Sequence, residues 1–306
     1  MLTKRPYQKP ALTVQEQIKQ LKDRGMIFQD EIRAAEILSR VSYSRLRPYW
    51  YPFEADKTTH NFQQNTSFEV VWSLYEFDRA LRLLILEALE RFEVALRTQW
   101  AHQMGLNNGP FGYLEPIHYH DSKRFQNDYQ RLRDEWARTN KADDPVFLHF
   151  ENTYQEVLPP VWLACEVMSL GNLGKWFYNL ADKTVSKDIA ALFSLPDRYL
   201  KNATRHLVSV RNYAAHHARL WDRAFTVYQL PRLRKNPRNL RQSLDTGSQN
   251  QKIYPTLTLL LYLMQQLDPH HDWPTRFITL LNHNTTYLHR MGFPPDYAER
   301  PIWKAV

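Results

Sequence analysis

The chain has 306 residues, of which 43% are hydrophobic and 13% aromatic, so it can bury a large core and is not a disordered protein. Its 40 Lys and Arg residues exceed its 32 Asp and Glu residues, and the net charge of +8 favours a polyanionic partner such as nucleic acid. The single cysteine, Cys165, excludes an intramolecular disulfide and a cysteine-rich zinc site.

The sequence shows no secretory signal and no membrane span. The opening MLTKRPYQKPALT lacks the apolar core that a signal peptide needs. The most apolar stretch, 257–264, is far too short to cross a bilayer. We therefore expect a cytoplasmic protein without a membrane partner.

Apolar residues recur with the helical period along most of the chain, and glycine is scarce, so we predict an all-α protein. Thr13 and Glu16 form a T-x-x-E capping box, which predicts a helix ending near Arg24, and a second helix is expected over about 30–40. The segment YSRLRPYWYPFEAD, 43–56, contains two prolines and is expected to be an ordered loop or a short strand.

The central part of the chain is predicted to contain one long helix. From 67 to 102 there is no Gly or Pro, and apolar residues recur at intervals of three, four or seven, which predicts an amphipathic helix roughly 50 Å long. Gly171 and Gly174 are expected to mark a tight turn. Other helices are predicted over 122–140, 161–168, 175–180, 198–203, 204–224, 254–267 and 274–290, and a basic surface loop over 231–241.

We divide the chain into an N-terminal helical and aromatic segment (1–62), a helical core (63–225) and a C-terminal helical extension (226–306). On a helical wheel of the predicted 204–224 helix, with Arg211 at zero, Asn212, His216 and Arg219 fall between ~80° and ~140°. Leu207, Val210, Ala214, Ala218 and Trp221 form an apolar stripe on the opposite side, at ~260° to ~340°. The helix therefore presents an amide, an imidazole and a guanidinium together.

These groups suit the cleavage of RNA without a metal ion. A histidine can take or give a proton at neutral pH, and a guanidinium can stabilise the negative charge that develops on phosphate oxygens. The substrate's own 2′-OH would be the nucleophile, leaving a 2′,3′-cyclic phosphate and a 5′-OH. Arg211 lies on the flank of the polar face, but its long side chain can reach back toward His216 or across to a partner helix. Arg211 and His216 are the candidate catalytic residues, and Asn212 would orient the phosphate or the imidazole.

The segment RNYAAHHARLW, 211–221, resembles the R-N-x-x-A-H-H-x-R-L-W signature of Abi-like proteins, the AbiD/AbiF type of bacterial abortive-infection protein in the HEPN superfamily. The opening KPALTVQEQIKQLKDRG, the run YEFDRALRLLILEALERFEVALRT and the block VWLACEVMSLGNLGKWFYNL resemble other parts of the family pattern, in the expected order. The resemblance spans most of 9–225, and nothing beyond about residue 223 matches.

The resemblance implies a HEPN-type helical bundle, with an N-terminal helical extension and extra C-terminal helices. It also implies an R-x(4–6)-H ribonuclease site, carried here by Arg211 and His216. His217 satisfies the same spacing, so the choice of histidine stays open, with His217 as a supporting residue. HEPN ribonucleases generally act as dimers whose motifs face each other, which implies a homodimer. An active ribonuclease needs restraint, and we expect an antitoxin, with a small RNA as the candidate.

Several other residues have two interpretations. Arg219 could contact phosphate or pair with Glu90 or Glu93, and Trp221 is expected in the core. The histidine pair at 118/120 lacks a carboxylate at a convincing spacing, and the pair at 270/271 lies in a loop flanked by prolines, so we expect no metal and no cofactor. Basic and aromatic residues that alternate over 43–51 could bind RNA or pack as an aromatic plug: Tyr43, Arg45, Arg47, Tyr49, Trp50 and Tyr51.

Two functions compete with the ribonuclease. The first is a non-catalytic RNA-binding protein that uses the polar helix face as a phosphate clamp. The second is a protein-interaction module that senses phage.

Overall fold

The computed structural model describes residues 6, 8, 10–245 and 251–305. Within these residues the regular structure is helical, and β pairing is limited to isolated bridges such as that between Glu54 and Phe62, so the all-α prediction is confirmed. The chain forms two compact units, Met1–Ala80 and Leu81–Val306. No helix in the described part of the chain is long and apolar enough to cross a membrane.

The first unit begins with two short helices, both predicted. Helix α1, Val14–Asp23, starts with the predicted capping box: the Thr13 hydroxyl accepts from the Glu16 N–H, and the Glu16 carboxylate accepts from the Thr13 N–H. Helix α2, Glu31–Arg40, is capped by Asp30. Gly25, at φ 90°, makes the left-handed turn that ends the α1 region.

The prediction of a loop or strand over 43–56 is wrong. Tyr43–Trp50 is helix α3, which contains Pro48 and continues into a 3-10 turn, η1, Tyr51–Phe53. Tyr49 is 2% exposed and Trp50 is fully buried, and the Tyr49 hydroxyl donates to Asp78 at 2.6 Å. Burial of two large rings outweighs the local cost of a proline inside a helix, a balance that local sequence rules do not contain.

Helix α4, Phe68–Asn108, is the predicted long helix and runs six residues further than expected. Its 41 residues correspond to about 60 Å. The spacing of apolar residues places Val70 on the buried face of this helix, but Val70 is 40% exposed and the neighbouring Val71 is fully buried. Within the second unit the buried face of α4 consists of Leu81, Ile85, Leu89, Phe92, Leu96, Trp100 and Met104.

The second unit follows with six helices of the core region. They are α5 (Ser122–Arg138), α6 (Pro145–Thr153), α7 (Val161–Val167), α8 (Leu170–Asn179), α9 (Lys183–Ala191) and α10 (Asp197–Ala215). Short 3-10 turns lie at Gly112–Leu114, Pro116–His118 and Lys141–Asp143. Helices α6 and α9 were not predicted, and 198–215 is one continuous helix that ends nine residues before the predicted 224.

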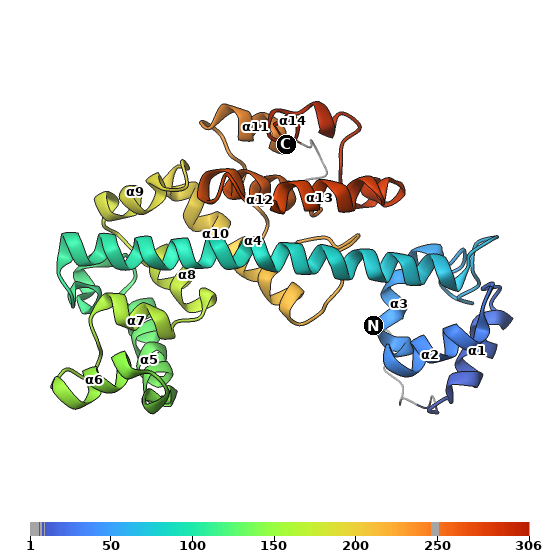
Figure 1. Ribbon diagram of the computed structural model, residues 1–306, viewed down its shortest axis with the longest axis horizontal. Helices are drawn as coiled ribbons and strands as arrows, with labels where there is room; N and C mark the ends of the chain where they lie inside the picture. Colours follow the sequence, from blue (N-terminus) through green and yellow to red (C-terminus); the bar gives the residue numbers. More distant parts are fainter. Residues whose placement is uncertain (1–5, 7, 9, 246–250, 306) are drawn as a thin grey trace. The chain divides into compact units, whose positions relative to one another are not determined.

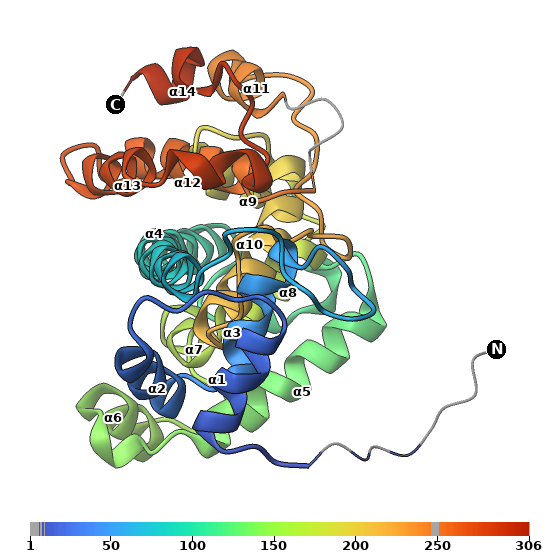
Figure 2. The ribbon, with the colours of Figure 1, turned by 90° about the vertical axis from the view of Figure 1, so that its right-hand side faces the viewer.

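The C-terminal helices form two further layers over α4 and α10 (Figures 1 and 2). The inner layer is α12 (Tyr254–Leu267), as predicted, and α13 (Trp273–Asn282), which is shorter than predicted and is followed by the 3-10 turn η6, Thr285–Met291. The outer layer is α11 (Arg238–Leu244), where a loop was predicted, and α14 (Pro301–Lys304), preceded by the 3-10 turn Tyr297–Glu299.

Hydrogen bonds and ion pairs join the inner layer to α4. The Trp273 indole N–H donates to the Leu84 carbonyl at 2.7 Å, and Arg91 pairs with Asp268 at 3.3 Å. The described residues of the C-terminal extension therefore pack against α4 within the second unit.

Gly174 and Gly171 lie inside helix α8 and do not form the predicted turn. A Cβ on Gly174 would be 3.2 Å from the Thr204 methyl of α10, whereas a Cβ on Gly171 would meet Val208 at an ordinary 3.6 Å. The missing side chain at Gly174 therefore allows α8 to lie close against α10. The Thr204 hydroxyl donates to the Leu200 carbonyl at 2.8 Å, which fixes the methyl in place.

We expect Gly174→Ala to lower the free energy of unfolding by about 1–2 kcal/mol, because the fixed Thr204 methyl cannot move aside. Gly171→Ala is the matched control and should be neutral or stabilising by up to about 1 kcal/mol, since alanine favours a helix. Urea denaturation of the two variants checks this. Equal stabilities would contradict the close packing at Gly174.

Candidate nucleic-acid site

The two adjacent histidines lie at the end of helix α10. His216 is the C-cap, and His217 follows in the left-handed region, at φ 57°. The His217 N–H donates to the Ala214 carbonyl and the Ala218 N–H to the Tyr213 carbonyl, which is the Schellman pattern. The predicted continuation of the helix to 224 is therefore wrong, and Arg219 does not share a helical stripe with Asn212.

The turn after His217 is held by the residues that follow it. Trp221 is fully buried, as predicted, and its indole N–H donates to the Tyr287 carbonyl at 3.4 Å. Asp222 pairs with Lys252 at 2.6 Å and with Arg290 at 3.3 Å. These contacts fix the end of α10 to the C-terminal helical extension.

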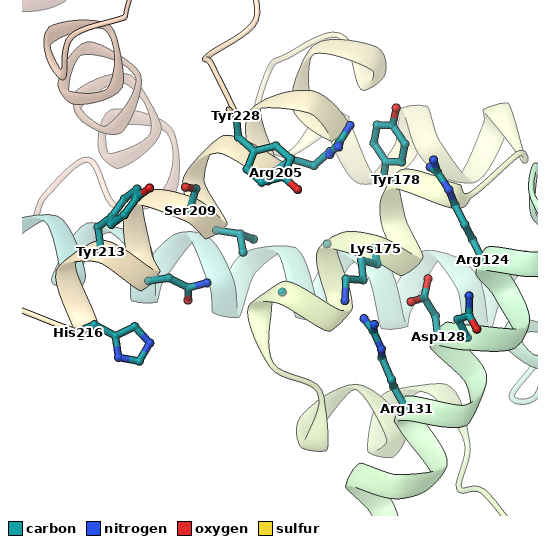
Figure 3. A pocket seen from close by; sticks show the side chains of 15 residues that line it. Arg124, Asp128, Arg131, Lys175, Tyr178, Arg205, Ser209, Tyr213, His216 and Tyr228 are labelled. Atoms are coloured by element: carbon teal, nitrogen blue, oxygen red, sulfur yellow. The ribbon is translucent and has the colours of Figure 1, made fainter. Parts of the chain in front are cut away.

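His216 borders a groove of about 870 Å³, shown in Figure 3, whereas His217 is not among its lining residues. Three helices line the groove, and each contributes residues spaced as on one helix face. These residues are Arg124, Asn127, Asp128 and Arg131 of α5; Gly171, Gly174, Lys175 and Tyr178 of α8; and Arg205, Val208, Ser209, Asn212 and Tyr213 of α10. His216 and Tyr228 complete the lining.

Buried amides fix the α5 wall of the groove against α8. The Asn179 side chain donates to the Asp121 carbonyl at 2.9 Å and accepts from the Asp121 N–H at 3.0 Å. Further along, the Asn172 amide donates to Glu135 at 2.7 Å. These bonds join both halves of α5 to α8, so the positions of the α5 side chains in the groove are set by the core.

The groove is strongly basic. Arg124, Arg131, Lys175 and Arg205 contribute four positive charges against one carboxylate, Asp128. Within the described residues, Arg131, Lys175 and Arg205 form no ion pair, whereas Arg124 pairs with Asp121 at 3.2 Å. The net positive charge of the groove suits a polyanionic ligand.

Asp128 is a groove residue that sequence analysis missed. Its side chain is buried, and this burial raises the pKa of the carboxyl to about 6, although the charges of Arg131 and Arg124 lower it. A buried carboxyl among cations gives no motif in the sequence. The only sequence feature that could have indicated it is its spacing, which places Asp128 on the same face of α5 as Arg124 and Arg131.

Arg211 lies beside the groove and does not line it. It borders a smaller hollow of about 330 Å³ with Glu90, Glu93 and Arg97 of α4. Its guanidinium donates to the side-chain oxygen of Asn212 at 3.4 Å, and Asn212 does line the groove. Asn212 therefore connects the motif arginine to the groove that His216 borders.

The other sequence candidates lie elsewhere. In the first unit, Tyr49 and Trp50 are buried, so their rings are not available for stacking on bases. In the same helix, Arg47 is 3.8 Å from Glu54, and Arg45 is exposed.

Three further motif side chains have partners of their own. Arg219 lies over the Trp221 ring at 5.8 Å. Arg97 and His102 also have the R-x(4–6)-H spacing, but Arg97 donates to Glu93 and to the Met168 carbonyl and so has a structural role. His118 is 3.7 Å from Glu115, and among the described residues no three His, Cys, Asp or Glu side chains form a group that could hold a metal ion.

His206 of α10 is buried beside the groove and holds the backbone of Tyr228, a residue that lines it. The Tyr228 carbonyl can only accept, so Nδ1 of His206 carries the proton and donates to it at 2.6 Å, while Nε2 accepts from the Thr256 hydroxyl at 2.7 Å. Burial lowers the pKa of the imidazole to about 4. A neutral imidazole thus joins α10, α12 and the segment that carries Tyr228.

The fold and the groove together define an all-α protein in which Asn212 and His216 of the 211–221 motif line a basic groove. A family model of Abi-like proteins matches residues 36–222, more than half of the chain, and the chain belongs to this family. The match supports a role in abortive infection, a form of phage defence, and leaves out the opening 9–25 and the C-terminal helices. No curated protein and no solved structure matches the chain.

We expect acid to destabilise the protein through His206. The unfolded chain protonates this residue below its ordinary pKa of 6.5 and the folded chain only below about 4. The free energy of unfolding should therefore fall by on the order of 3 kcal/mol as the pH falls through that window. Denaturation of the wild type and of His206→Gln across this range measures the difference between their free energies of unfolding. This difference should shrink as the pH falls.

His283→Gln, at an exposed histidine, is the control and should follow the wild type. Asp128, whose pKa is raised, changes the free energy of unfolding with pH in the opposite direction. Because Asp128 is present in all three proteins, its effect cancels when they are compared. A difference between wild type and His206→Gln that does not change with pH would contradict the buried neutral imidazole.

Proposed function

We propose that this Abi-like protein is a metal-independent endoribonuclease that acts as a toxin in phage defence. The observation that carries the proposal is that His216 and Asn212 of the family motif border a groove with four cations and one carboxylate. A ribonuclease needs both a proton-transfer group and a surface that attracts the phosphate backbone. The groove supplies both with residues from three helices.

Each motif residue has a role in the proposed chemistry. His216 acts as the general acid or base for 2′-OH attack and departure of the 5′-oxygen. Arg211 stabilises the negative charge on the pentacoordinate phosphorus transition state. Asn212 orients the phosphate, and its side-chain oxygen accepts a hydrogen bond from Arg211. The products are a 2′,3′-cyclic phosphate and a 5′-OH.

The placement of Arg211 supports a homodimeric site. In one chain Arg211 borders the hollow on α4, while His216 borders the large groove. In a two-fold dimer, Arg211 of one chain can approach a phosphate beside His216 of the other, which is the arrangement that the HEPN resemblance implies. We further propose that an antitoxin, with a small RNA as the candidate, blocks the same groove.

We expect the wild type to cut total cellular RNA in EDTA and to leave cyclic-phosphate ends. Arg211→Ala should reduce the rate by about 100-fold to 1,000-fold, as when one charge-stabilising donor is removed. Mapping of the ends by sequencing is the measurement. No cleavage by the wild type, with RNA still bound, would favour the non-catalytic RNA-binding protein.

A pair of variants at adjacent positions identifies the catalytic histidine. His216→Asn should lose between about 100-fold and 10,000-fold in rate, because the proton-transfer group is removed. His217→Asn should keep most of the activity, since asparagine tolerates the left-handed conformation at φ 57° and the helix end is preserved. The reverse pattern would assign the chemistry to His217.

Mixing two inactive variants tests the dimeric site. If Arg211 of one chain acts with His216 of the other, a mixed dimer of Arg211→Ala and His216→Asn contains one intact site. Co-refolded variants should then regain roughly a quarter of wild-type activity. If both residues act within one chain, no intact site forms and the mixture stays inactive.

A further inference from the structure

Arginine and tyrosine side chains alternate along the wall of the basic groove away from His216. The guanidinium of Arg205 lies 4.5 Å from the ring centre of Tyr178 and 5.2 Å from that of Tyr228, and Arg124 lies 5.8 Å from Tyr178 (Figure 3). We call these four residues the ladder. It runs from α5 across α8 and α10 to the 226–230 segment.

The ladder is fixed by core contacts. The backbone of Tyr228 is held by its hydrogen bond to the buried His206, and Tyr178 lies one residue before the amide of Asn179 that braces α5. Two tyrosine rings flank the Arg205 guanidinium, which orders its planar group. Within the described residues Arg205 has no acidic partner, so its N–H groups are available to an anion.

The outer end of the ladder is open. Tyr228 is 46% exposed, although a tyrosine ring has a large apolar surface that proteins usually bury. An exposed ring beside arginine side chains, of which Arg205 has no acidic partner among the described residues, has the composition of a surface that binds single-stranded nucleic acid. The ring stacks a base and the cations hold the backbone.

The ladder is distant from the proposed reaction centre. Arg205 and His216 are eleven residues apart along α10, which corresponds to about 16 Å, or three helical turns. A strand cleaved beside His216 must therefore extend along the groove to reach Tyr228. Binding energy gained there can fix the register of the strand at a bond that the ladder does not touch.

We propose that the ladder is a subsite for single-stranded RNA, remote from the cleaved bond, in which a base stacks on Tyr228 and Arg205 and Arg124 hold the flanking phosphates. Tyr178 acts as a positioning residue that orders the two guanidinium groups. This inference rests on the proposed ribonuclease function for the direction of the strand, and its test is a binding measurement that needs no cleavage.

The test uses a single-stranded RNA of about twelve nucleotides with 2-aminopurine at one position, bound to the His216→Asn protein so that the strand stays intact. Fluorescence anisotropy measures affinity, and quenching of 2-aminopurine reports stacking. Tyr228→Leu should weaken binding about tenfold and remove the quenching. Tyr228→Phe should restore both, because it keeps the ring.

Arg205→Met should change a different property. Loss of one phosphate contact should reduce the slope of log affinity against log salt by about 0.7. The matched controls are Arg133→Met, an exposed arginine on the other face of α5, and Tyr154→Leu, an exposed tyrosine outside the groove. Both controls should bind as the parent protein does.

The outcomes separate this inference from the proposed function. If the wild type does not cut RNA but the ladder variants bind more weakly, the ladder is a binding subsite and the ribonuclease proposal fails. If the wild type cuts RNA and the ladder variants bind like the controls, the ladder proposal is overturned. Equally tight binding of double-stranded RNA, with the same response to Tyr228→Leu, would also overturn it, because paired bases cannot stack on the ring.

Discussion

The close packing of helix α8 against α10 is the constraint on which the candidate site depends. Gly174 permits this approach, because any side chain at that position would press on the Thr204 methyl of α10. Gly171 and Gly174 also line the groove, so the absence of side chains there leaves its floor open. Gly174 therefore lets the two helices come together, and both glycines keep the space above them accessible.

Buried polar contacts then set the positions of the groove walls. Asn179 holds the start of α5 against the end of α8, and His206 holds the Tyr228 segment against α10 and α12. Each of these side chains is buried, and a buried polar group that loses its partner costs roughly 1–3 kcal/mol. Their bonds resist displacement, so the cations on the surface are carried by rigid elements.

The end of α10 shows how a short motif can serve structure and chemistry together. His217 takes the left-handed conformation that closes the helix, Trp221 and Asp222 fix the chain that follows, and His216 is left at the border of the groove. Two adjacent histidines thus have different environments, although they have the same side chain. Spacing alone does not distinguish them, since both satisfy the same motif.

The sequence by itself determined the all-α class, helices α1, α2, α4 and α12, the capping box at Thr13, the burial of Trp221 and membership of the Abi-like family. These features depend on local periodicity, capping and short motifs. The helix at 43–50 and the end of α10 at Ala215 were missed, because burial of Trp50 outweighs Pro48 and because a histidine occupies the position where glycine is usual.

The groove was decided only by the tertiary structure. Its cations lie on three helices far apart in the chain, and each helix alone shows no more than a polar face. Asp128 and the ladder gain their properties from neighbours that the sequence does not name. A pattern of residues fixes which face of a helix is polar, but only packing decides which polar faces meet.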